Sequence, residues 1–190
     1  MNKLQNTTLY LIRHAETTWS STGQHTGITD LPLTPSGVIQ AKKLKSRLND
    51  YRFSEVYSSP LQRARKTAEL AGYHPTITPD LTEWNYGTYE GKTTEEIQQK
   101  DPHWNLFVDG APGGETPAQV KARAQHLLSI LKPGHIALFG SAHILRVIAA
   151  CFLNLPLKDA AEIFLSPASI SILGHEHDQP SILLWNDIEK

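Results

Sequence analysis

The sequence has little sulfur, almost no net charge and no long apolar run. Its 190 residues include one cysteine, Cys151, which lies in an apolar segment and is interpreted as a small core residue. The formal net charge of −1 argues against non-specific binding to nucleic acid, which requires a broad basic surface. A few arginines and histidines in one cleft barely alter that total, so a small basic pocket is still allowed.

No segment suits a membrane span or a secretion signal. The longest apolar segment, Ile144 to Leu153, is interrupted by Arg146 and falls well short of the roughly 20 residues that a bilayer requires. No apolar stretch precedes the first expected strand, so no secretory signal is expected. We therefore expect a cytoplasmic protein, and a charged content of 19% fits a soluble globular domain.

Strand-like and helical patterns alternate along most of the chain. Strands are expected at 9–12, 54–58, 135–139, 169–173 and 181–185, with a short one opening at Ile77. Helices are expected from Pro35, Pro60, Thr93 and Pro117 and through 144–153, with loops at 20–34, 81–91 and 104–117. This alternation predicts one domain over 1–190, a three-layer α/β/α sandwich with a mostly parallel central sheet and a terminal hairpin.

Reactive side chains follow the expected strands, where open α/β sheets bind their ligands. Two arginines, an imidazole and a carboxylate suit phosphoryl transfer to a histidine. The arginines neutralise phosphate oxygens, the imidazole attacks phosphorus and the carboxylic acid protonates the departing alkoxide. Fixed cations would take the place of a metal, so no metal or other cofactor is expected. The candidates are Arg13, His14, Arg63, Glu83, Ser141 and His143.

Each candidate also has a purely structural interpretation. Arg13 and His14 could form a surface pair after an edge strand. Arg63 could be a solvated arginine, since it lies off the apolar stripe of its expected helix. In the terminal hairpin, His175 and His177 could bind zinc, but such a site needs further ligands, and a solvated turn is favoured.

The motifs around these candidates resemble those of the histidine phosphatase superfamily, also called phosphoglycerate-mutase-like proteins. LIRHAETTW is similar to the R-H-G-E-T signature, with Ala15 where glycine is usual. GQHTGITDLPLTPSG, SSPLQRARKTAE and LTEWNYGTYEG are similar to three further segments of the family. The resemblance therefore runs through nearly the whole chain.

This resemblance implies roles for individual residues. His14 would be the phosphorylated nucleophile, Arg13 and Arg63 would be phosphate ligands, and Glu83 would be the proton donor. Further residues would lie near the substrate, namely Ser20, Gln24, Thr26, Gly27 and Tyr86.

One departure concerns the second catalytic histidine of the family. That histidine begins an H-G motif and is followed five positions later by an arginine. Here Arg146 anchors the pattern, so Ser141 stands where the histidine is expected. His143 then matches a variable position, from which a shifted loop could still bring it into the pocket.

We therefore expect a phosphomonoesterase that hydrolyses a small phosphorylated metabolite through a phosphohistidine, slowly because of Ser141. The expected partner is that metabolite, with neither nucleic acid nor membrane, and no oligomeric state is predicted. Two alternatives stay open: a phosphoglycerate mutase and a phosphate-binding module with impaired catalysis. Against the mutase, Trp84 and not a basic residue follows Glu83, and the next 30 or so residues hold only Lys92 and Lys100 as cations.

Overall fold

The computed structural model describes residues 4–188, and its centre is a six-stranded sheet in the order β3-β2-β4-β1-β5-β6. Strands β3, β2, β4 and β1 are parallel, whereas β5 and β6 are antiparallel. This arrangement confirms the mostly parallel sheet and the terminal hairpin. The strands are β1 (Thr7–Arg13), β2 (Glu55–Ser58), β3 (Thr76–Ile77), β4 (Gly134–Gly140), β5 (Ile170–Glu176) and β6 (Gln179–Asp187).

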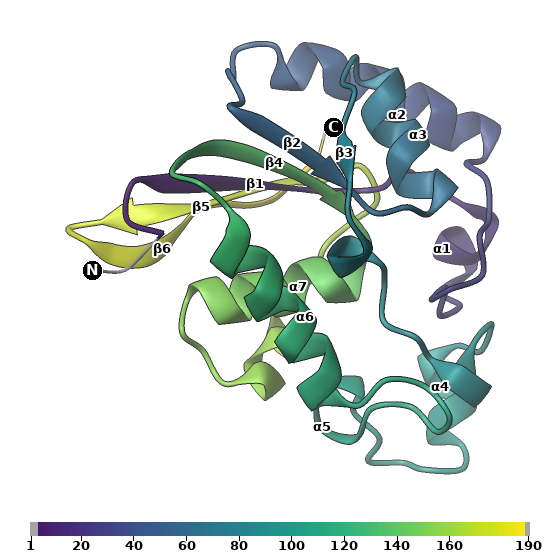
Figure 1. The fold of residues 1–190 in the computed structure, drawn as a ribbon. Helices are drawn as coiled ribbons and strands as arrows, with labels where there is room; N and C mark the ends of the chain where they lie inside the picture. The colour runs from purple at the N-terminus through teal and green to yellow at the C-terminus, as the bar shows by residue number, and fades with distance from the viewer. Residues whose placement is uncertain (1–3, 189–190) are drawn as a thin grey trace.

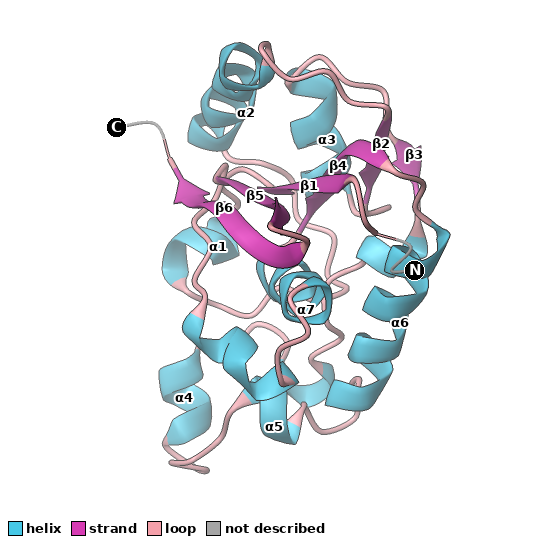
Figure 2. Ribbon diagram, turned by 90° about the vertical axis from the view of Figure 1, so that its left-hand side faces the viewer, coloured by secondary structure: helices cyan, strands magenta, loops and turns pink. Residues whose placement is uncertain are grey.

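Helices cover both faces of the sheet, which confirms the three-layer α/β/α architecture (Figures 1 and 2). One layer contains α2 (Pro35–Leu48) and α3 (Gln62–Leu70), and the other contains α6 (Pro117–Ile130) and α7 (Ala142–Phe152). Successive side chains of β1 build the two cores in turn, because side chains alternate across a strand. Leu9 and Leu11 pack in the core under α6 and α7, and Tyr10 and Ile12 pack under α2 and α3.

Threonine caps explain where three of the expected helices begin. Thr34 caps α2, Thr93 caps α4 (Thr94–Gln98) and Thr116 caps α6, each by accepting a backbone N–H with its side-chain oxygen. Proline at the first position of α2 and α6 costs nothing, because that position needs no backbone donor. The predicted starts of α2 and α6 are confirmed. Helix α4 begins at Thr94, one residue after the predicted Thr93, and α3 begins at Gln62, two residues after the predicted Pro60.

Several short turns of helix correct the segments that were expected to be loops. Helix α1 (Thr18–Thr22) begins at a capping box, and α5 (Leu106–Asp109) buries its first two residues. Both helices are too short for a 3.6-residue period to show in the sequence. The segment 81–91 contains part of one 3₁₀ turn, η1 (Pro79–Leu81), and all of another, η2 (Gly87–Tyr89), and η3 (Leu157–Glu162) precedes β5.

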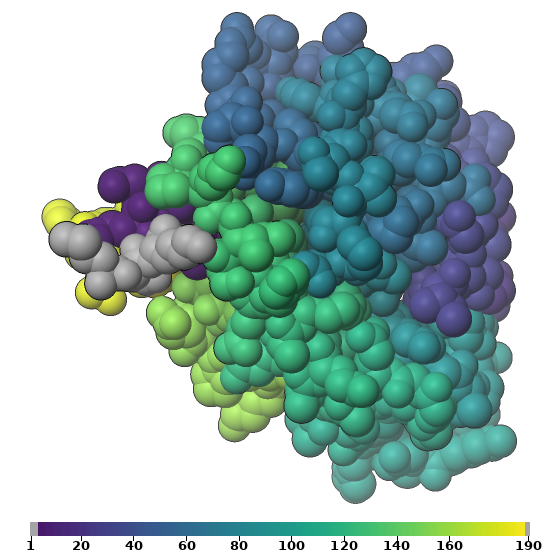
Figure 3. All heavy atoms as spheres, viewed as in Figure 1, coloured from purple at the N-terminus to yellow at the C-terminus, as the bar shows by residue number. Residues whose placement is uncertain are grey.

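The tip of the β5–β6 hairpin lies at the opposite end of the molecule from α1 and α4 (Figures 1 and 3). The loops that follow β1 and β4 therefore gather away from the hairpin tip, near α1. No helix within residues 4–188 is long and apolar enough to cross a membrane.

Candidate active site

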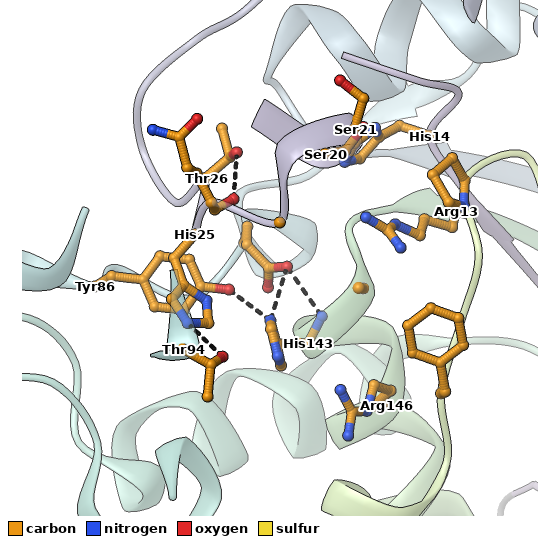
Figure 4. A pocket seen from close by; sticks show the side chains of 16 residues that line it. Arg13, His14, Ser20, Ser21, His25, Thr26, Tyr86, Thr94, His143 and Arg146 are labelled. Carbon is orange, nitrogen blue, oxygen red and sulfur yellow. Dashed lines mark hydrogen bonds and ion pairs between the residues drawn. The ribbon is translucent and has the colours of Figure 1, made fainter. Parts of the chain in front are cut away.

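A cavity of about 500 Å³ opens where β1 ends and α7 begins (Figure 4). Three predicted site residues, Arg63, Ser141 and Gly27, are buried and lie outside its lining. The remaining predicted residues line the cavity together, namely Arg13, His14, Ser20, Gln24, Thr26, Glu83, Tyr86 and His143. The fold thus brings most of the candidates to one place, although they come from segments far apart in the sequence.

His14 is held in the form that a nucleophile requires. Its backbone N–H donates to the carbonyl of Gly140 at 2.8 Å, which fixes it beside the end of β4. Its Nδ1 lies 2.8 Å from the carbonyl oxygen of Ala15, and since a carbonyl only accepts, Nδ1 carries the proton. Burial, helped by the charges of Arg63 and Arg13, lowers the pKa of His14 well below its ordinary value. The neutral ring therefore presents the lone pair of Nε2.

Arg13 supplies a fixed cation next to His14. One terminal nitrogen donates to the carbonyl of Leu165 at 2.5 Å, and the buried Nε has no partner among residues 4–188. Burial lowers the pKa of Arg13 to about 10, so the guanidinium stays charged at neutral pH. A half-buried guanidinium that lines the cavity and has an unpaired N–H is suited to an anion that enters it.

Arg63 is fully buried, so the interpretation as a solvated arginine off the helix stripe is wrong. Its terminal nitrogens donate to the carbonyls of Thr26, Gly27 and Thr29 at 2.7–2.9 Å, and its Nε lies 3.3 Å from Ser141 Oγ. These bonds use four of the five guanidinium N–H groups. Arg63 thus clamps the loop that carries Thr26, and its charge acts on His14 from behind the cavity wall.

Gly27 is explained by the close approach of two loops. A Cβ at this position would lie 2.4 Å from the carbonyl oxygen of Trp84, closer than atoms can pack. The Oε1 of Glu90 accepts the backbone N–H groups of Gly27 and Thr29, which ties the two loops together. Gly27 therefore shapes the site by letting the loops meet, and its absence from the cavity lining follows from this position.

Glu83 accepts three backbone N–H groups and is almost fully buried. Its Oε1 accepts from Trp84 and Ile144 at 2.8 Å, and its Oε2 accepts from His143 at 2.9 Å. Two of these donors belong to the first turn of α7, where the helix dipole also favours a negative charge. Burial opposes ionisation, but the interactions with His143 and with the N–H of Trp84 outweigh it and lower the pKa of Glu83 to about 2.

His143 lines the cavity directly, because α7 begins at Ala142 and its first turn faces Glu83. Its Nδ1 lies 2.6 Å from the hydroxyl of Tyr86. Burial raises the pKa of Tyr86 well above its ordinary value and lowers that of His143, so a neutral phenol faces a neutral ring, and its hydroxyl can donate to Nδ1 or accept from it. The same Nδ1 lies 3.7 Å from Glu83 Oε2. The other ring nitrogen, Nε2, has no hydrogen-bond partner in the part of the chain that is described.

The side chains of three predicted substrate-binding residues form hydrogen bonds with the backbone of the loops around the cavity. Ser20 Oγ bonds the backbone of Thr17, Gln24 donates to the carbonyl of Gly91, and Thr26 Oγ1 donates to the carbonyl of Gln24. These side chains shape the cavity wall, and any contact with a ligand would be an additional one.

Among the lining residues that were not predicted as site residues from the sequence, His25 and Arg146 carry ionisable side chains. The ring of His25 packs at 4.8 Å from that of Tyr86, and burial, with the nearby His143, lowers its pKa to about 4. Arg146 interrupts an otherwise apolar helix, and that interruption, together with its match to the arginine of the family pattern, was the available sign of a special role. Elsewhere, no group of three or more His, Cys, Asp or Glu within 4–188 is placed to hold a metal ion.

Comparison with known proteins gives the same assignment as the motifs. The sequence profile of the Histidine phosphatase superfamily (branch 1) matches residues 9–188. An acid phosphatase of Mycobacterium tuberculosis is 35% identical, over 92% of this chain and 89% of that protein. A sedoheptulose 1,7-bisphosphatase of Saccharomyces cerevisiae is 32% identical, over 80% of this chain and 69% of that protein. The solved structure of an open reading frame from Mycobacterium tuberculosis has a TM-score of 0.92 at 34% identity, covering 97% and 99% of the two chains.

The fold and the cavity define an α/β protein of the phosphoglycerate-mutase-like kind, with a neutral histidine beside a buried arginine. The chain belongs to the histidine phosphatase superfamily.

The environment of Glu83 predicts a pH-dependent contribution to stability. The carboxyl titrates near pH 4.5 when unfolded and near 2 when folded, so ionisation stabilises the fold above about pH 4.5, and this gain is lost as the pH falls toward 2. At pH 7, Glu83→Gln should lower the free energy of unfolding by about 3 kcal/mol. Urea denaturation between pH 7 and pH 3 should show that deficit shrinking below about pH 4.5. A deficit independent of pH, or one equal to that of the exposed control Glu95→Gln, would contradict the assignment.

Proposed function

We propose that this chain is a phosphomonoesterase that hydrolyses a small phosphorylated metabolite, such as a sugar phosphate, through phosphorylated His14. The observation that carries the proposal is the bond from His14 Nδ1 to the Ala15 carbonyl, which leaves a neutral Nε2 in a cavity with Arg13. The relatives named acid phosphatase and sedoheptulose 1,7-bisphosphatase support hydrolysis of phosphate esters.

The proton for the leaving group enters with the substrate. Glu83 is ionised before substrate binds, because its pKa is about 2, so it cannot donate a proton in that state. A phosphate ester has a second pKa of about 6, and its monoanion still carries one proton. As the ester enters, that proton passes to Glu83, which becomes the acid that the reaction requires.

The proposed reaction has two chemical steps. His14 Nε2 attacks phosphorus, the ester P–O bond breaks, and Glu83 protonates the departing oxygen so that an alcohol leaves. Water next attacks phosphorus and gives a proton to Glu83 as the P–N bond breaks. Phosphate dianion, neutral His14 and protonated Glu83 are the products of this second step. Glu83 then returns its proton to the phosphate, which leaves as the monoanion and restores the ionised carboxylate.

Ser141 makes the proposed hydrolysis slow. Its hydroxyl is buried against Arg63 and lies outside the cavity lining, so it offers no donor to the transferring phosphoryl group. With its proton on Nε2, His143 would present one neutral donor to the cavity from the start of α7. Losing one pre-organised donor in such a site typically costs about 10²–10³ in rate.

The lysines in the segment after Glu83 do not support the alternative of a phosphoglycerate mutase. Lys92 and Lys100 lie outside the cavity lining, next to Tyr89 and Ile97. A mutase must hold its dephosphorylated product long enough to rephosphorylate it, which requires extra cationic contacts. We therefore favour release of the alcohol and hydrolysis of the phosphoenzyme.

Turnover should pass through one covalent phosphate on His14. Rapid quenching at alkaline pH with radiolabelled substrate should trap one acid-labile phosphate per chain, and His14→Ala should show none and lose turnover. His74→Ala, which removes an exposed histidine, is the matched control. Wild-type turnover in His14→Ala would refute the mechanism.

The pH profile should follow the substrate and not the enzyme. Because Glu83 is ionised and His14 is neutral through the neutral range, kcat/KM should fall about tenfold per pH unit above the second pKa of the ester, near pH 6. An ester whose second pKa is about one unit lower should shift the profile by about one unit. A profile that is flat from pH 6 to pH 8 would show that the proton does not arrive with the substrate.

Restoring a histidine at position 141 should accelerate the reaction. Ser141→His should raise kcat at least about tenfold, because a ring there adds a donor to the phosphoryl oxygens. Inhibition by inorganic phosphate should change less, because Arg13 already holds the ground state. A Ser141→His enzyme no faster than the parent, together with loss of activity in His143→Ala, would assign the role to His143 and overturn the explanation by Ser141.

A further inference from the structure

We propose that Arg146 forms a second anion subsite in the same cavity, so that the preferred substrate carries a second anionic group besides the phosphate that reacts at His14. The simplest such substrate is a small bisphosphate. This inference rests on the proposed phosphatase function and specifies its substrate class. In the view of Figure 4, Arg13 lies between His14 and Arg146, so a substrate extended past Arg13 would bring its other end to Arg146.

The guanidinium of Arg146 is held rigidly. Its Nε donates to the carbonyl of Ala160 at 2.7 Å, and one terminal nitrogen donates to the carbonyl of Ala161 at 2.6 Å. Its flat face lies over the ring of Phe107, 4.6 Å from the ring centre. The other terminal nitrogen has no hydrogen-bond partner among the described residues. A planar donor fixed in this way loses little conformational freedom when it binds a phosphate.

Arg146 is a buried cation that has no direct ion pair. It is only 8% exposed, and none of the ion pairs found in residues 4–188 includes it, although the charges of Glu83 and Glu162 act on it from further away. Once Glu83 has taken a proton, the charges of Arg13 and Arg63 balance the two charges of a phosphate at His14. Arg146 then keeps only the more distant charge of Glu162, so a second anion in the cavity would stabilise the buried guanidinium.

A purely structural role is the competing explanation, since Arg146 joins α7 to η3 through two carbonyls. The two explanations differ in what they predict for ligands. A structural arginine would affect every ligand of the cavity alike, whereas an anion subsite affects ligands with a second charged group more than those without one.

Binding of non-hydrolysable ligands separates these explanations. Calorimetry would compare α,ω-alkane bisphosphonates of increasing length with alkyl phosphonates of the same lengths, on the full chain. The parent should bind the best bisphosphonate at least about tenfold more tightly than its monophosphonate partner. Arg146→Gln should reduce that ratio to about twofold or less, and Arg146→Lys, which keeps the charge but loses the planar fork, should give an intermediate ratio.

Arg47→Gln is the matched control. Its guanidinium also donates to backbone carbonyls, those of Ala168 and Asp187, but Arg47 lies outside the cavity lining. The ratio should be unchanged in this variant. If Arg146→Gln does not fold, the Arg146→Lys ratio decides, and a value equal to that of the parent would overturn the inference.

Two further results would also overturn the inference: equal affinity of the parent for the two ligand series, or an equal loss of both in Arg146→Gln. The proposed function is tested separately, by phosphate release from the corresponding mono- and bisphosphate esters. A bisphosphonate preference that depends on Arg146, without hydrolysis of any ester, would support the subsite and refute the phosphatase.

Discussion

The carboxylate of Glu83 caps α7 from a distant loop, and most of the cavity depends on this interaction. The residue in the N-cap position, Ser141, makes no side-chain cap, because its hydroxyl is bonded to Arg63. Glu83 instead accepts the N–H groups of His143 and Ile144, which otherwise would be buried without partners. This cap also brings Tyr86, three residues further along the loop, to the ring of His143. The positions of the first turn of α7, of the His143 ring and of Tyr86 therefore follow from one contact.

Burial sets the charge of the cavity in a simple way. The three histidines in its lining, His14, His25 and His143, all have lowered pKa values, with desolvation as the largest cause. They are neutral near pH 7, so the permanent charges are those of the arginines and Glu83. The fixed charges of the arginines attract anions into such a cavity, and the net charge of its side chains changes little over the physiological pH range.

Short-range sequence patterns predicted the architecture, and contacts between residues far apart in the sequence explain the features that these patterns did not predict. The apolar run Leu9–Ile12 ends in Arg13, and this placement at a strand end is confirmed. Arg63 was misplaced because the carbonyls that bury it come from Thr26 and Gly27, in a loop far back along the chain. Helix α5 is a single turn fixed by burial, which no periodic pattern reveals. For Arg146 the sequence showed a charge in an apolar helix, but not which cavity it reached.

In the proposed mechanism, binding and catalysis are separable because different groups of the cavity serve them. Arg13 is positioned without any contact to the side chain at position 141. The loop that Arg63 clamps depends on that side chain only through one weak hydrogen bond, 3.3 Å long, from Arg63 to Ser141. Ground-state attraction for phosphate therefore survives a serine at that position. The serine weakens stabilisation of the transition state more, because that stabilisation requires hydrogen-bond donors directed at the oxygens of the phosphoryl group during its transfer. Membership of the superfamily accordingly predicts the fold. In the proposed mechanism, the rate depends on whether His143 can supply the donor that Ser141, buried against Arg63, does not present to the cavity.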